Sequence, residues 1–172
     1  MQTIKKLLPK IIEFLSNEDN FQDVDSLIIN QRKPHTQRLF FMIGEDRICL
    51  HTFQFCNWEE CFEHPHSWPA EILILKGKYK HWLSDVTELN QQVNLEGGSY
   101  KILKPGDSYL MDSPFLWHRV QPLMETKTLM VNGPIWKEKS KYCVFTENDK
   151  YISIPRYFGV SQYGRPISIS FN

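Results

Sequence analysis

The chain has 172 residues, of which 41% are hydrophobic and 13% aromatic, enough to fill the core of one domain. Its 20 Lys and Arg residues balance 20 Asp and Glu residues, so no net field attracts nucleic acid or acidic membranes, and we expect neither as a partner. The first residues do not read as a secretory signal, and no later run reaches the roughly 18 apolar residues of a membrane span, so we expect a cytoplasmic protein with reduced cysteines.

An amphipathic helix is predicted close to the N-terminus. Apolar residues recur at three- and four-residue steps from Ile4 to Leu15, the period of a helix with one buried stripe. Pro9 should either kink this helix or delay its start. Residues 17–34 are mostly polar and are expected to be a connection, so residues 1–34 form a helical cap with its connection and residues 35–172 form a second, β-rich unit.

Short β-rich runs alternate with turn signals through the rest of the chain. The expected strands are residues 37–43, 47–55, 70–76, 99–104, 108–111, 117–123, 126–133, 142–145, 151–154 and 167–171. Because no helical pattern separates these runs, they favour an antiparallel sandwich or barrel over a parallel sheet with crossover helices.

The segment EHPHSWPAE carries the strongest chemical signal. His64 and His66 are two residues apart, so in a strand their imidazoles project from the same face and can converge on one ion. Glu71 follows His66 at an odd separation, which turns its carboxylate to the opposite face of a straight strand. Pro65 and Pro69 favour a bend between them. We therefore expect an irregular backbone before Glu71; otherwise Glu71 is not a ligand.

A third imidazole is expected from His118, which opens a strand after two turns. The predicted metal ligands are His64, His66, Glu71 and His118. Nitrogen and oxygen donors with open positions favour Fe(II), with Mn, Ni, Co or Zn as alternatives, over a closed structural zinc site. A competing zinc site would use Cys56, Cys61, His64 and His66.

These residues resemble the two sequence motifs of the cupin superfamily. The first motif, His-x-His-x(3 or 4)-Glu-x6-Gly, is matched with one residue fewer before the glycine by His64, His66, Glu71 and Gly77. The second is matched more loosely by Gly106, Pro114 and His118. The segments LHTF, HRV and TLMVNGP are similar to those of a poorly characterised group of single-domain cupins. The resemblance implies an all-β jelly-roll barrel (double-stranded β-helix) with an N-terminal helical segment, a C-terminal strand extension and a metal near the barrel mouth.

Candidate catalytic residues come from the predicted pocket wall. In the run at residues 47–55, Arg47 and His51 share one face, and we expect that face to look into the barrel, with Tyr79 among the aromatic residues that wall the cavity. A hydrogen-bonded core histidine and a solvated arginine are the competing interpretations, and the latter applies equally to Arg38 and Arg119.

Motifs and site together predict a metal-dependent cupin, with a non-haem iron oxygenase or dioxygenase acting on a small polar or anionic molecule as the leading function. A non-redox isomerase or lyase that uses the ion as a Lewis acid, and a non-catalytic ligand-binding cupin, stay open as alternatives. Apolar residues alternate over residues 164–172, a pattern that can add a strand to a partner's sheet, so a homodimer is expected.

Overall fold

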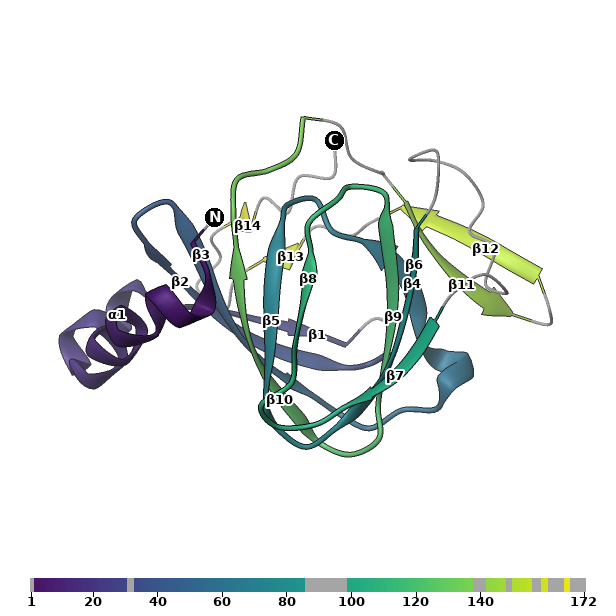
Figure 1. Cartoon of the computed structure of the whole chain (residues 1–172), viewed down its shortest axis with the longest axis horizontal. Coiled ribbons are helices and arrows are strands. Elements are labelled where there is room, and N and C mark those ends of the chain that lie inside the picture. The colour runs from purple at the N-terminus through teal and green to yellow at the C-terminus, as the bar shows by residue number, and fades with distance from the viewer. Residues whose placement is uncertain are drawn as a thin grey trace.

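Two six-stranded antiparallel sheets enclose a barrel, with one helix packed outside it (Figure 1). The computed structural model describes residues 2–30, 33–85, 99–137, 142–147, 150–155, 159–160 and 166–167, and the side chains of residues 2–30, 33–84 and 99–137. Within that part of the chain, no helix has the length and apolar character needed to cross a membrane.

The first sheet has the order β1-β2-β3-β10-β5-β8 and the second β12-β11-β4-β9-β6-β7. The strands of the first sheet are β1 (Asp25–Ile29), β2 (Thr36–Ile43), β3 (Asp46–Phe53), β10 (Thr126–Asn132), β5 (Ala70–Lys76) and β8 (Ser108–Met111). Those of the second are β12 (Lys150–Pro155), β11 (Tyr142–Glu147), β4 (Phe62–Pro65), β9 (Leu116–Pro122), β6 (Tyr79–Asp85) and β7 (Ser99–Leu103). A short separate pair is formed by β13 (Gly159–Val160) and β14 (Pro166–Ile167).

The predicted all-β class is confirmed, and four strands come from segments where none was expected: β1, β4, β6 and the short β13. The connection predicted over residues 17–34 contains the short helix η1 (Glu18–Asp23) and then β1, which pairs with β2 as an edge of the first sheet. Strand β4 contains Pro65 at its end, and β6 follows directly after the turn at Gly77. Of the predicted C-terminal strand, only residue 167 lies in the described part of the chain, so the pattern behind the expected homodimer lies outside it.

Helix α1 (Ile4–Ser16) lies on the outer face of the first sheet. Its buried stripe of Ile4, Leu7 and Ile11 packs with Phe41, Ile48 and other outward-facing residues of β2, β3 and β10. The predicted amphipathic helix is therefore confirmed. It begins at Ile4 and runs through Pro9, so the proline does not delay its start.

The barrel interior contains an apolar cluster contributed by both sheets. Ala70 and Ile72 of β5 pack there with Met111 and Met130, and Leu83 and Leu116 approach from the second sheet. Residues of β5 alternate strictly, because Ala70 and Ile72 face inward while Leu73 packs with the helix cluster outside.

The β5–β6 turn requires a glycine. Gly77 has a φ of 77°, in the left-handed region that residues with a Cβ rarely adopt. A Cβ at this position would also collide with the carbonyl oxygen of Glu125 and lie 2.8 Å from Oγ1 of Thr126. The turn that follows β5 is thus fixed both by its own conformation and by close contact with the β9–β10 connection.

Glu71 follows the same alternation as its neighbours and faces outward, toward helix α1. Its Oε2 accepts a hydrogen bond of 2.7 Å from the backbone N–H of Ile4, the first residue of the helix. Asp46 accepts from the N–H of Gln2 at 3.3 Å. The first N–H groups of a helix have no partner within it and carry partial positive charge, so both carboxylates stabilise this end. The structure does not support the expectation that Glu71 turns inward: the irregular backbone lies between β4 and β5, and Glu71 already belongs to a regular strand.

A buried ion pair joins β4 to β9 on the opposite face from the interior. Arg119 and Glu63 are 2% and 0% exposed, and the guanidinium contacts the carboxylate directly. The guanidinium also lies 4.6 Å from the ring centre of Trp58, in the short helix η2 (Trp58–Glu60). Burial raises the pKa of the Glu63 carboxyl to about 7, and Arg119 opposes that rise.

We predict that Glu71→Ala lowers the free energy of unfolding by about 1 kcal/mol, because one helix N–H loses its partner. Chemical denaturation followed by far-UV circular dichroism measures this change. The control is Glu125→Ala, which removes a carboxylate from an exposed ion pair and should change stability by less than about 0.5 kcal/mol. An unchanged stability in Glu71→Ala would contradict the role assigned to this carboxylate.

We predict that Arg119→Met destabilises the protein by about 3–5 kcal/mol, because it leaves the Glu63 carboxyl buried without its counter-charge. The double variant Glu63→Gln with Arg119→Met should recover part of this loss, since it removes the uncompensated charge. Urea denaturation of the two single variants and the double variant provides the coupling energy. Additive losses would show that the two side chains do not act as a pair.

Candidate metal centre

The pairing of β4 with β9 brings two of the predicted ligands, His64 and His118, face to face. His64 is the direct cross-strand partner of His118 in this antiparallel pair, although 54 residues separate them in the chain. His66 follows β4 by one residue, and its ring lies 5.7 Å from that of His64 and 4.8 Å from that of His118. The sequence-based expectation that the three imidazoles meet is confirmed.

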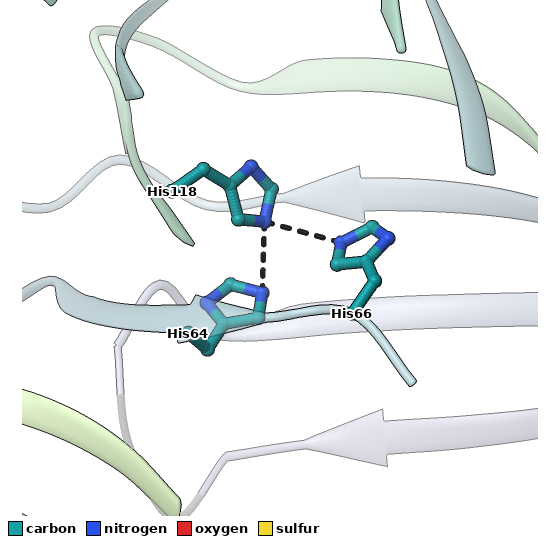
Figure 2. A group of neighbouring side chains, drawn as sticks. All are labelled: His64, His66 and His118. Carbon is teal, nitrogen blue, oxygen red and sulfur yellow. Dashed lines mark hydrogen bonds between the residues drawn. The ribbon is translucent and has the colours of Figure 1, made fainter. Parts of the chain in front are cut away.

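The ring nitrogens of the three histidines point toward one another (Figure 2). Nε2 of His118 lies 3.0 Å from Nε2 of His64 and 3.1 Å from Nε2 of His66. All three donor atoms lie within 4.8 Å of one another. His118 is buried, whereas His64 and His66 are half-buried, so the cluster is not sealed on every side.

These separations are those expected for ligands of one divalent ion. With metal–nitrogen distances of about 2.1 Å, two nitrogens lie about 3.0 Å apart at a right angle and about 3.4 Å apart at the tetrahedral angle. The two observed distances, both from Nε2 of His118, match the right angle between neighbouring ligands of an octahedral ion. The donor set therefore fits a divalent metal that keeps further coordination positions open.

A fourth histidine, His81, contacts the cluster from β6, the strand next to β9 in the same sheet. Its Nε2 lies 3.3 Å from Nδ1 of His118, on the side away from the other two histidines. Burial, together with the charge of Lys101, lowers the pKa of His81 to about 4, so its ring is neutral near pH 7. If His118 binds a metal through Nε2, its Nδ1–H donates to His81, and this hydrogen bond fixes the orientation of the ligand.

Sequence reasoning missed His81 because it belongs to neither motif. The available signal was the alternation over residues 79–85, in which Tyr79, His81 and Leu83 share one face of a strand.

Glu71 is not among the residues that the structure brings to the three histidines. Its carboxylate is occupied at the helix N-terminus on the outside of the barrel. The competing zinc site is not assembled either: the Sγ atoms of Cys56 and Cys61 contact each other at 3.3 Å, and the described residues group no thiol with the histidines.

His51, a predicted catalytic residue, lies in the barrel interior with both ring nitrogens occupied. Nε of Arg38 donates to Nε2 of His51 at 2.8 Å, so that nitrogen carries no proton, and Nδ1–H therefore donates to Oγ1 of Thr128 at 3.2 Å. Burial, then the charges of Arg38 and His66, hold the pKa of His51 well below its usual value. His51 is thus a neutral, oriented group near His66.

The other two predicted catalytic residues occupy different parts of the interior. Tyr79 is buried and donates its hydroxyl proton to the hydroxyl of Tyr109 at 2.8 Å. Burial raises the pKa of both phenols, so both stay protonated. Arg47 is half-buried, and its guanidinium lies 5.4 Å from the ring centre of Trp68. Neither residue contacts the three histidines through a hydrogen bond that would define a role, so their catalytic assignments stay predictions.

A cavity of about 480 Å³ lies beside the cluster, between β6, β7 and β8. Its lining includes His81 and Tyr109, whose ring centres lie 4.1 Å apart at a tilt of 35°, together with Lys101, Ser99 and Ser108. The ring of Tyr109 also lies 6.0 Å from that of His118. The cavity therefore borders the histidine cluster through His81 and Tyr109.

No protein-family model and no curated protein matches this chain. Solved structures do. Fe(II) HppE aligns with a TM-score of 0.50 at 12% identity, over 64% of this chain and 57% of that one. Fe(II)-HppE with the alternative substrate (S)-1-HPP gives the same TM-score and identity, over 64% of this chain and 56% of that one. Hydroxypropylphosphonic acid epoxidase from S. wedmorenis aligns with a TM-score of 0.48 at 13% identity, over 62% and 55% of the two chains.

This chain thus spans little more than half of the length of the solved proteins that it resembles. At this level of identity the likeness shows the fold. Together with the two facing antiparallel sheets and the N-terminal helix, it shows that the chain folds as a cupin-type β barrel.

Proposed function

We propose that this protein is a metal-dependent oxygenase of the non-haem iron type, which acts on a small polar or anionic molecule and holds Fe(II) with His64, His66 and His118. The observation that carries the proposal is the convergence of three imidazole nitrogens, at 3.0 and 3.1 Å, inside a closed β barrel. The Fe(II) proteins among the structures of similar fold support the choice of metal.

Three neutral imidazoles leave the full charge of a divalent ion uncompensated, which favours an anionic substrate. A ferrous ion would supply the one-electron chemistry that reaction with dioxygen requires. The protein's own contribution is to bind, orient and keep water out. His81 and the pairing of β4 with β9 orient the ligands, and the apolar cluster around Met111 and Met130 limits water inside the barrel.

We predict that the protein binds one Co(II) or Zn(II) ion per chain and that His118→Ala weakens this affinity by at least about 100-fold, since loss of an outer partner of a ligand already costs 10–100-fold. Competition with a chromophoric chelator measures the affinity. The matched control is His35→Ala, because His35 belongs to no metal-ligating group in the described residues and its affinity should match that of the wild type. Equal affinities for His118→Ala and His35→Ala would exclude the proposed centre.

The variant Glu71→Gln tests whether the metal is bound by the three histidines alone or by the three histidines and Glu71. The carboxylate bonds to the helix and not to the histidines, so we predict that this variant keeps the metal affinity of the wild type. The same chelator competition measures it. A loss comparable to that of His118→Ala would show that Glu71 moves inward and binds the metal.

The reaction class is tested by loading the protein with Fe(II) under argon, adding members of a panel of small carboxylates and phosphonates, and then admitting oxygen. We predict oxygen uptake that depends on one member of the panel, and none in the Zn(II)-loaded protein, because Zn(II) has no redox chemistry. Equal turnover with Zn(II) and Fe(II) would indicate a Lewis-acid isomerase or lyase instead. No turnover with either ion, in a protein whose folding is indifferent to chelators, would indicate a ligand-binding cupin.

A further inference from the structure

The cavity beside the metal centre presents hydrogen-bond donors in an arrangement that the proposed oxygenase function does not itself require. His81 of β6 and Lys101 of β7 are direct cross-strand partners, and both line the cavity. Side chains of such partners start about 5 Å apart on one face of a sheet. The imidazole and the ammonium therefore reach the same region of the cavity.

The charge of Lys101 has no carboxylate partner among the residues that the structure describes. Asp107 also lines the cavity, but its Oδ2 accepts a hydrogen bond of 2.9 Å from the backbone N–H of Lys104 and so belongs to the β7–β8 turn. The hydroxyls of Ser99, Ser108 and Tyr109 add further donors to the wall. The three remaining lining residues, Leu83, Ile102 and Leu103, are apolar, so the wall offers donors for an anionic group beside a surface for a small apolar portion.

The histidine chain sets the direction of the His81 donor. When His118 binds a metal through Nε2, its Nδ1–H donates to Nε2 of His81, so Nδ1 is the ring nitrogen of His81 that is left to carry a proton. This N–H is the remaining polar group of a side chain that lines the cavity. An anion that accepts a hydrogen bond from this N–H would complete a hydrogen-bonded chain that runs from the anion through His81 to His118 and the metal. A carboxylate supports a metal-bound histidine in this way in many sites.

We propose that this cavity binds the anionic group of a small organic acid, with Lys101 and His81 as its donors. The inference rests on the proposed metal centre for the direction of the His81 donor, and it names the substrate class of that same site. Its volume of about 480 Å³ is within the range of small-molecule sites, so the rest of a small acid fits beside the anionic group.

The test measures the binding of acetate and methylphosphonate to the Co(II)-loaded protein, with acetamide as the uncharged analogue of acetate, by isothermal titration and by cobalt absorption. We expect acetate and methylphosphonate to compete for one site, and acetamide to bind at least about tenfold more weakly, since a hydrogen bond to a charged group contributes about 1.5–3 kcal/mol. Lys101→Met should weaken acetate binding about tenfold, and Lys101→Arg should retain it.

Lys127→Met is the matched control, because Lys127 is exposed on β10 and lies outside the cavity. It should bind acetate like the wild type. Acetate binding that is equal in Lys101→Met and Lys127→Met, or no binding of either anion, would overturn the inference. Metal binding is measured first: a protein that takes up Co(II) but not the anions refutes the anion site alone, whereas a protein that takes up no Co(II) refutes the metal centre.

Discussion

The register between β4 and β9 is the constraint on which the rest of the site depends. It places His64 opposite His118 on the inner face and, one residue along each strand, Glu63 opposite Arg119 on the outer face. A slip of one residue between the two strands would turn one of these imidazoles to the opposite face of the sheet from the other. The buried ion pair would lose its geometry at the same time, so one register serves both the ion pair and the approach of two histidines 54 residues apart.

The interior is divided into polar and apolar regions along the barrel. Five of the six histidines of the chain, all except His35, lie on or beside inward faces, where each ring contacts another imidazole, a hydroxyl or a guanidinium. Apolar clusters flank this band, one around Met111 and Met130 and one around Ile74 and Leu103. Burial lowers the pKa of His51 and His81, so these two neighbours of the cluster are neutral near pH 7.

Most of the fold and the meeting of three histidines could be predicted from the sequence because they depend on local periodicity and motif spacing. The odd number of residues from His66 to Glu71 suggested that their side chains face opposite sides of the sheet. The structure agrees, since the regular strand begins before Glu71. His81 and the strand that carries it were missed, because the partner of a ligand is chosen by strand order, which no local pattern reveals. The same holds for the outward-facing Glu63 and Arg119, whose pairing exists only across two strands.

The proposed metal centre requires one ion to bind three imidazoles at once. Anomalous diffraction from crystals of the Co(II)-loaded protein tests it directly, because the peak locates the ion independently of any assumption about ligands. We expect a single peak about 2.1 Å from Nε2 of each of His64, His66 and His118. A peak elsewhere in the barrel, or ordered imidazoles in unchanged positions with no ion between them, would contradict it.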